Sequence, residues 1–282
     1  MIEAGLVREG GGTRGLFTSG VLDFFMDKGL EFANAYGVSM GACNLCSYIS
    51  GQRGRTLAVT VDYMNDPDYC GVKPLLKTGD LFNAKMAYED VPLRLNPFDF
   101  EHALSYPGNA YAVITNIETG RAEYPRINDL KNSLTLVRAS ASMPMVSKIV
   151  RIDDGKYLDG GIADSIPIMK SLHDGNKKNV VIMTKEPGYI RKPFSMLAGA
   201  KVLYRKYPYL LHDLAVRHTR YNRIVAFLEK EHARGNLFLI RPSVDIGVGR
   251  VEKDVEKITK LYEQGYHEAE NCYEDMMRYL EK

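Results

Sequence analysis

Tyr36-Gly37-Val38-Ser39-Met40-Gly41-Ala42-Cys43-Asn44 is the stretch that decides the fold, because it predicts the end of a strand, a sharp turn and the start of a helix. Ser39 is the centre of a G-x-S-x-G pattern formed with Gly37 and Gly41. A serine at such an elbow has a strained backbone, and its neighbours two positions away must be small for the turns to pass each other. Amides at the start of the following helix favour negative charge there. The pattern alone fits a structural turn as well as a nucleophile.

A glycine-rich turn precedes this elbow and follows the first expected strand, residues 4–9. The turn consists of Gly10, Gly11, Gly12, Thr13, Arg14 and Gly15. Its spacing formally matches the dinucleotide fingerprint G-x-G-x-x-G, which expects an acidic residue about 20 positions further on, at the end of the second strand. That strand, expected at residues 32–38, leads into Ser39 instead, so the sequence argues against a nucleotide site.

The same glycine turn has a second interpretation. Consecutive strands of a parallel sheet are commonly neighbours, so the turn and the elbow are expected to face one crevice. The amides of Gly10, Gly11 and Gly12 would then converge beside the Ser39 hydroxyl. Fixed amide donors without side chains are what an oxyanion hole requires. The two turns together therefore predict a serine nucleophile with its oxyanion hole.

The remaining apolar runs predict a doubly wound α/β sheet. Strands are expected at residues 111–116, 121–124, 180–184 and 237–241, and a hairpin over residues 148–159. Helices are expected after the glycine turn and at residues 43–50, 56–65, 130–141 and 208–234. Residues 66–83 are expected to form a loop over or near the site. Residues 251–282 are expected to form one amphipathic helix that docks on the sheet.

Composition and charge exclude several classes of protein. The chain has 282 residues, 45% of them hydrophobic, and a net charge of +2, which does not favour nucleic acid as a partner. No run approaches the roughly 18 apolar residues of a spanning helix. The N-terminus has no signal-peptide pattern, so a cytoplasmic location is expected. Cys43-x-x-Cys46 falls on a predicted helix, where it suits packing better than metal or redox use.

Residues 185–234 differ from the rest of the chain because they are basic. They hold 11 lysine and arginine residues against 4 acidic ones, a net charge of +7, which leaves −5 for the remainder. The simpler interpretation is a helical cap with solvated charges, and the alternative is a peripheral contact with an anionic membrane. We divide the chain into a core, residues 1–184, and a basic helical C-terminal extension, residues 185–282, that contains a late strand and packs on the core.

A serine nucleophile needs a base, and the chain offers two kinds. The histidines are His102, His173, His212, His218, His232 and His267. All but the first follow Asp159, so the order Ser-Asp-His of α/β-hydrolases is formally available, yet none lies in a glycine-rich setting. Asp159 is the stronger candidate, because Asp159-Gly160-Gly161 follows a strand and places a carboxylate on a tight turn. Such a base is weak at neutral pH, so it requires either partial desolvation of Asp159 or unusually strong stabilisation of the oxyanion.

These motifs, in this order and at similar spacing, resemble the patatin-like phospholipases over roughly residues 3–170. The small residues from Ala139 to Pro144 also look like a block of that family. Two departures are present. Glu9 opens the glycine turn where the family commonly has aspartate, and Met145-Val146 follows the block where an aromatic residue is often found. The second departure concerns the shape of the acyl pocket.

The resemblance implies a three-layer α/β/α fold with a mostly parallel central sheet and, here, a helical C-terminal extension. It implies hydrolysis of phospholipid or lysophospholipid esters by a Ser39–Asp159 dyad and an acyl-enzyme, without metal or cofactor. The residues that would support the elbow and the loop are Thr13, Arg14, Gly15, Gly37, Gly41 and Gly160. Arg14 would either meet a phosphate or anchor the loop. A small-ester carboxylesterase or acyltransferase and a non-catalytic lipid-binding module stay open as alternatives.

Overall fold

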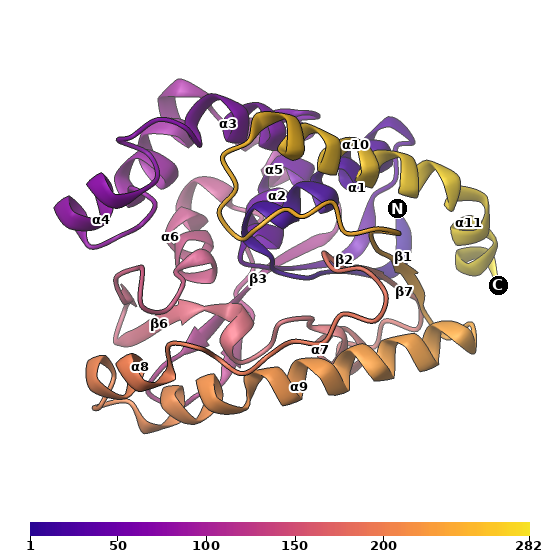
Figure 1. Cartoon of the computed structure of the whole chain (residues 1–282). Helices are drawn as coiled ribbons and strands as arrows, with labels where there is room; N and C mark the ends of the chain where they lie inside the picture. Colours follow the sequence, from indigo (N-terminus) through magenta and orange to yellow (C-terminus); the bar gives the residue numbers. More distant parts are fainter.

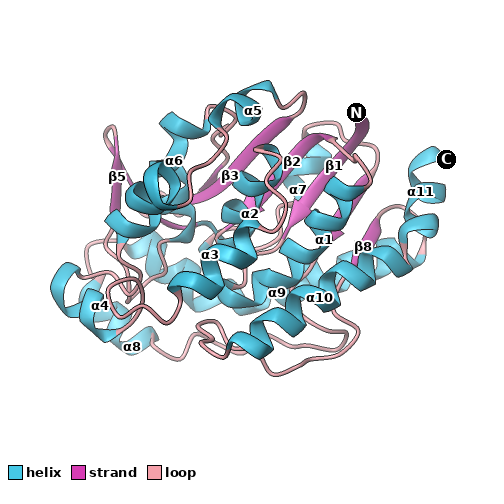
Figure 2. Cartoon of the chain, turned by 90° about the horizontal axis from the view of Figure 1, so that it is seen from above, coloured by secondary structure: helices cyan, strands magenta, loops and turns pink.

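One mixed sheet of eight strands forms the centre of the computed structural model, which describes residues 1–282. The strands are β1 (Ile2–Arg8), β2 (Phe32–Val38), β3 (Asn109–Asn116), β4 (Ala122–Glu123), β5 (Val150–Ile152), β6 (Gly155–Asp159), β7 (Asn179–Ile182) and β8 (Phe238–Ile240). Their order is β5-β6-β3-β2-β1-β7-β8, with β4 paired to β3, and they cross the molecule from β5 to β8 (Figure 2). Along this order, neighbouring strands from β3 to β8 pair in parallel. β4 and β6 pair antiparallel with β3, and β5 pairs antiparallel with β6. The predicted mostly parallel sheet is confirmed.

Helices cover both faces of this sheet (Figure 1). They are α1 (Leu16–Asp27), α2 (Met40–Ile49), α3 (Arg55–Tyr63), α4 (Val72–Thr78), α5 (Phe100–Ser105), α6 (Leu130–Ala141), α7 (Ile168–His173), α8 (Leu197–Leu203), α9 (Pro208–Ala233), α10 (Val255–Asn271) and α11 (Tyr273–Glu281). Two 3₁₀ turns, η1 (Gly12–Gly15) and η3 (Gly160–Ile162), and a π-helix, η2 (Met86–Leu95), complete the elements. None of these helices combines the length and the apolar character needed to cross a bilayer.

Alternation along the strands places apolar side chains in cores on both faces of the sheet. On β7, Val180 and Ile182 belong to the core that also contains residues of α1, α2 and α10. The neighbouring Val181 and Met183 belong to the opposite core, together with residues of α7 and α9. Because β7 is buried on both sides, its sequence is a continuous apolar run. The three-layer α/β/α architecture is therefore confirmed.

The C-terminal helix is the first correction to the sequence analysis. It is two helices, α10 and α11, separated at Cys272, and α10 lies on α1 rather than on the sheet (Figure 1). Two glycines allow the close crossing: a Cβ at Gly20 would overlap the carbonyl oxygen of Tyr262, and one at Gly265 would overlap that of Phe17. The place on the sheet predicted for this helix is already taken by α1, so α10 packs one layer further out.

Residues 66–83 are the second correction, because the expected loop contains α4. Gly71 precedes this helix with a φ of 138° and Gly79 ends it in the left-handed conformation with a φ of 80°. Glycine is the usual residue at such a left-handed helix end. Seven residues hold two helical turns, which is too short for a clear apolar period, so only the two glycines marked this helix in the sequence.

Gly265→Ala tests the crossing of α1 and α10. The added methyl group has no room against the backbone of Phe17, so we expect the free energy of unfolding to fall by about 1–3 kcal/mol. Urea denaturation followed by circular dichroism measures the change. The matched control is Gly199→Ala on α8, where a Cβ would meet only the flexible end of Met145 at 3.2 Å. An unchanged stability in Gly265→Ala would contradict the packing described here.

Candidate active site

Ser39 lies at the junction of β2 and α2 in a strained backbone conformation. Its φ is 55° and its ψ is −123°, a region that side-chain-bearing residues seldom occupy. The Ser39 amide donates to Ser140 Oγ of α6 at 2.9 Å, and the Ser39 carbonyl accepts from the Cys43 amide at 3.2 Å. A Cβ at Gly37 would lie 2.5 Å from the Gly41 carbonyl oxygen, so the elbow closes only with glycine there.

The register of the sheet brings Asp159 to the same level as Ser39. Strand β3 lies between β2 and β6, with Val38 opposite Val113 on one side and Ile114 opposite Asp159 on the other. Ser39 directly follows Val38, so it lies one strand away from Asp159 across β3. Two residues that are far apart in the sequence therefore meet because both strands pair with β3.

Asp159 is 7% exposed and Ser39 is 8% exposed, and both line one cavity. The Asp159 carboxylate accepts a hydrogen bond from the Gly161 amide at 2.8 Å, and the Ser39 side chain lies close enough to lower the pKa of this carboxyl group. The turn that follows Asp159 packs directly on β3: a Cβ at Gly160 would overlap the carbonyl group of Val113. This close approach explains why glycine follows the aspartate.

Burial is the main influence on the protonation of Asp159, and it raises the pKa of the carboxyl group above its ordinary value. The Ser39 side chain, the positive charge of Arg217, the hydrogen bond from Gly161 and the charge of Arg250 lower the pKa, in that order, without offsetting the burial. A carboxylate with a raised pKa is a stronger base than an exposed one. Of the two conditions expected for this base, the desolvation of Asp159 is therefore present.

The glycine turn lines the same cavity beside Ser39. Gly10, Gly11 and Gly12 are all part of its wall, and none of their amides donates to a backbone carbonyl. A Cβ at Gly10 would lie 3.1 Å from the Ser39 Cβ, which places this glycine directly against the serine. The three amides therefore have no backbone acceptor, and Gly10 lies next to the serine.

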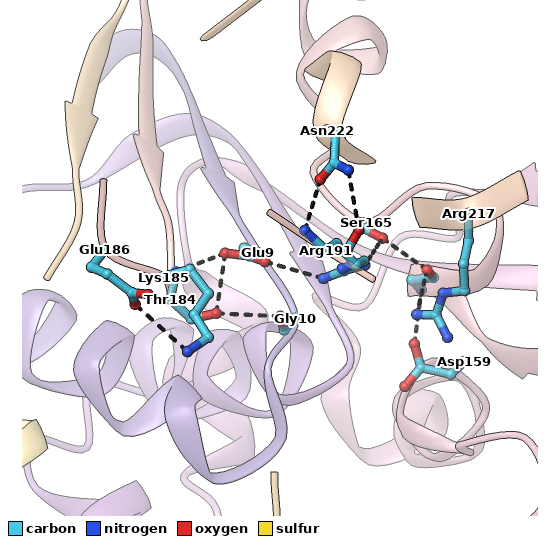
Figure 3. Close-up of polar contacts among 11 residues, drawn as sticks. Glu9, Gly10, Asp159, Ser165, Thr184, Lys185, Glu186, Arg191, Arg217 and Asn222 are labelled. Atoms are coloured by element: carbon cyan, nitrogen blue, oxygen red, sulfur yellow. Dashed lines mark hydrogen bonds and ion pairs between the residues drawn. The ribbon is translucent and has the colours of Figure 1, made fainter. Parts of the chain in front are cut away.

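Glu9 anchors the start of this turn. Its carboxylate accepts from the Thr184 amide at 2.7 Å and from the Thr184 hydroxyl at 3.1 Å, and it pairs with Arg191 at 3.4 Å (Figure 3). Arg191 in turn donates to Ser165 Oγ at 3.0 Å. The glutamate found where aspartate is common therefore ties the loop after β1 to the segment after β7.

Three charged residues of the cavity wall were missed from the sequence, and all are arginines from the last hundred residues: Arg191, Arg217 and Arg250. The only signal that could have indicated them was the basic composition of residues 185–234, which contain the first two. Arg14 of the glycine turn joins them in the wall. None of the six histidines lines this cavity or the apolar pocket described next.

A mostly apolar pocket also opens at Ser39. Its apolar side chains include those of Met40, Cys43, Met64, Tyr69, Phe82, Tyr88 and Met143. An adjoining cavity shares Cys43 and Tyr88 and continues the apolar wall to Phe98 and Val137. Cys43 and Cys46 are both free thiols on α2, and burial raises the pKa of Cys43 to about 12. These cysteines serve as packing groups on the wall.

Comparison with known proteins assigns this site to a family. A serine elbow on a three-layer α/β sheet is an arrangement found in acyl hydrolases. The family described as patatin-like phospholipase matches residues 6–171, and a domain of unknown function, DUF6363, matches residues 207–281. The uncharacterized protein YjjU of Escherichia coli (strain K12) is 30% identical over 244 residues, which are 84% of this chain and 68% of YjjU. The chain belongs to the patatin-like phospholipase family, whose members are lipid acyl hydrolases as a class.

The structure of VipD from Legionella pneumophila is also similar to this chain. The two share 14% sequence identity with a TM-score of 0.46. The alignment covers 99% of this chain but 66% of the VipD chain, just under two thirds of it.

Asp159→Asn tests the electrostatic environment of the carboxyl group. A carboxyl group whose pKa is higher in the folded chain binds more protons there than in the unfolded chain, so its contribution to stability falls as pH rises between the two pKa values. We expect Asp159→Asn to be more stable than the wild type at pH 8, and the difference to shrink as the pH is lowered through the raised pKa of Asp159. Urea denaturation at several pH values measures it. A variant that is less stable at pH 8 would contradict a buried, ionised Asp159.

Proposed function

We propose that the protein is a serine hydrolase that cleaves carboxylic esters of phospholipids or lysophospholipids. Ser39 is the nucleophile and Asp159 is its base. The observation that carries this proposal is the buried Asp159 carboxyl group beside Ser39, in a cavity whose wall also contains Gly10, Gly11 and Gly12. The family of the chain supports a lipid ester as substrate.

In the first half-reaction, Asp159 accepts the proton of the Ser39 hydroxyl while the oxygen attacks the ester carbonyl. The carbonyl oxygen becomes negative, and the amides of Gly10, Gly11 and Gly12 hold it. Collapse of this intermediate transfers the proton to the departing alcohol and leaves an acyl-enzyme on Ser39. In the second half-reaction, Asp159 takes a proton from water, which attacks the acyl group and releases the fatty acid.

The apolar pocket at Ser39 supports a lipid rather than a small polar ester. Its wall runs from Met40 past Cys43 and Tyr88 to the adjoining cavity at Phe98, so an unbranched acyl chain has apolar side chains along its path. Burial of each methylene contributes roughly 0.8 kcal/mol, which favours a long chain over a short one.

Labelling with a fluorophosphonate ester tests the dyad. We expect the wild type to be labelled, Ser39→Ala to lose all labelling, and Asp159→Asn to react at least about 100-fold more slowly, because general-base catalysis contributes roughly 100- to 10,000-fold. Rates are measured by in-gel fluorescence over time. Ser105→Ala is the matched serine control, since this residue is exposed at the end of α5. Unchanged labelling in a folded Asp159→Asn variant would remove Asp159 from the mechanism.

The basic extension supports a peripheral contact with an anionic membrane. On α8, Val202 is 75% exposed and Leu203 is 59% exposed, and Lys201 and Arg205 beside them are also exposed. On α4, Leu76 is 83% exposed. Figures 1 and 2 both place α4 and α8 at the same end of the molecule. Apolar side chains among cations suit insertion at the surface of anionic lipids.

The double substitution Val202→Glu and Leu203→Glu tests this contact. We expect the wild type to float with vesicles that contain phosphatidylglycerol and to be released by salt, because exposed charges are screened within about 10 Å at 0.1 M. The double variant should lose most of this binding while still reacting with the fluorophosphonate. Equal flotation of both proteins would show that α8 makes no contact with lipid.

A further inference from the structure

The apolar pocket at Ser39 adjoins a second cavity that does not itself reach the serine. The two cavities have six lining residues in common: Met40, Cys43, Thr60, Tyr69, Ala87 and Tyr88. Only the first has Ser39 in its wall. An acyl chain that is bound to Ser39 and is long enough to leave the first pocket therefore enters the second with the end that is furthest from the ester.

Arg55 is the one charged side chain in the wall of this second cavity. It is the first residue of α3 and is 8% exposed. Its guanidinium carbon lies 3.4 Å from the centre of the Phe98 ring, and its Nη2 donates to the Asn96 carbonyl oxygen at 2.5 Å. These contacts hold the guanidinium group in place, but neither of them supplies a negative charge.

No carboxylate is among the groups that act on the charge of Arg55, which are Cys46, Tyr69 and Cys43. Burial raises the pKa of each of these three groups, that of Cys43 to about 12, so they are neutral at pH 7. Burial also lowers the pKa of Arg55 to about 10, which leaves the guanidinium group charged at pH 7. Arg55 is therefore a buried cation without a counter-charge.

The hydrogen-bonding capacity of Arg55 is also largely unused. The bond to Asn96 is the only hydrogen bond that the side chain donates, and its Nε is buried without a partner. A buried charge costs free energy unless an opposite charge and hydrogen-bond acceptors offset the loss of water. The cavity wall contains no acidic residue, so a ligand in the cavity has to supply the negative charge.

We propose that Arg55 binds a carboxylate at the far end of the acyl chain, so that the enzyme prefers half-esters of dicarboxylic acids over esters of the matching fatty acids. A guanidinium group suits a carboxylate because it donates charge-assisted hydrogen bonds in a planar arrangement. A chain of the same length that ends in a methyl group would cover Arg55 with apolar atoms and leave its charge unpaired.

This inference rests on the proposed hydrolase function and specifies the acyl part of the substrate. The chemical steps at Ser39 stay the same. The bond between the acyl carbon and the alcohol oxygen breaks, water adds to the acyl carbon, and the products are an alcohol and a dicarboxylic acid.

Matched p-nitrophenyl esters test the preference. The half-esters of adipic, suberic and sebacic acid are compared with the hexanoate, octanoate and decanoate. We expect kcat/KM to be at least about tenfold higher for the half-ester at the chain length that reaches Arg55. For shorter chains the ratio should fall below one, because the carboxylate would then lie unpaired in the apolar pocket. A ratio of one or less at every length would overturn the inference.

Arg55→Gln tests whether Arg55 is the source of the preference, and we expect it to lower the largest ratio about tenfold or more. Arg53→Gln is the matched control, because it removes the same charge two residues away from a side chain that is 52% exposed and lies outside both cavities. Its ratios should equal those of the wild type. Equal ratios in the wild type and a folded Arg55→Gln variant would overturn the inference, and the wild-type ratios decide alone if this variant does not fold.

Binding to the Ser39→Ala variant separates this inference from the hydrolase proposal. By calorimetry, a monomethyl ester of one of the three diacids should bind at least about tenfold more tightly than the matching fatty acid methyl ester, and Arg55→Gln should remove this advantage. If this is observed but the wild type neither hydrolyses any ester nor reacts with the fluorophosphonate, the subsite stands and the hydrolase proposal falls. If the wild type hydrolyses the octanoate without preferring a half-ester of any length, the hydrolase proposal stands and the subsite falls.

Discussion

Close backbone packing around β3 is the constraint on which the site depends. The turn after β6 can lie against Val113 only because Gly160 has no side chain, and the elbow after β2 can close only because Gly37 has none. These two contacts hold Ser39 and Asp159 on either side of one strand at one level of the sheet. The positive φ of Ser39 costs conformational free energy. The surrounding sheet and the hydrogen bond to α6 hold the residue in this conformation.

The last hundred residues belong to the site as much as the first two hundred. Strand β8 extends the sheet beside β7, and α9 covers one face. Arg191 pairs with Glu9 at the base of the glycine turn, and Arg217 reaches the turn that follows Asp159. The family match ends at residue 171, so these contacts come from outside the part of the chain that resembles the family.

The sequence predicted the parts of the site that have a local signature. Ser39 and Asp159 each lie in a short glycine-flanked motif, because the steric requirement that selects glycine acts on immediate neighbours. Strand β2 and helix α6 were predicted at their observed bounds, since a long apolar period or a buried run leaves little ambiguity. The arginines of the cavity were missed because the residues next to Arg217 and Arg250 in the sequence form no motif that indicates a cavity wall. The two helix errors have the same origin: α4 is too short to show a period, and the partner of α10 is a distant helix.

The hydrogen bonds between Thr13 and Arg250 affect the order in which the molecule folds. The Thr13 amide and hydroxyl both donate to the Arg250 carbonyl oxygen, at 2.9 Å and 3.2 Å, across 237 residues of chain. During synthesis, the sheet can begin to assemble once β7 has emerged, but the wall beside the glycine turn stays open until residue 250 has left the ribosome. Contacts between such distant residues form late, because closing a long loop costs entropy before any contact stabilises it. A chain interrupted before that point would therefore contain both the serine and the aspartate and still lack a closed cavity around them.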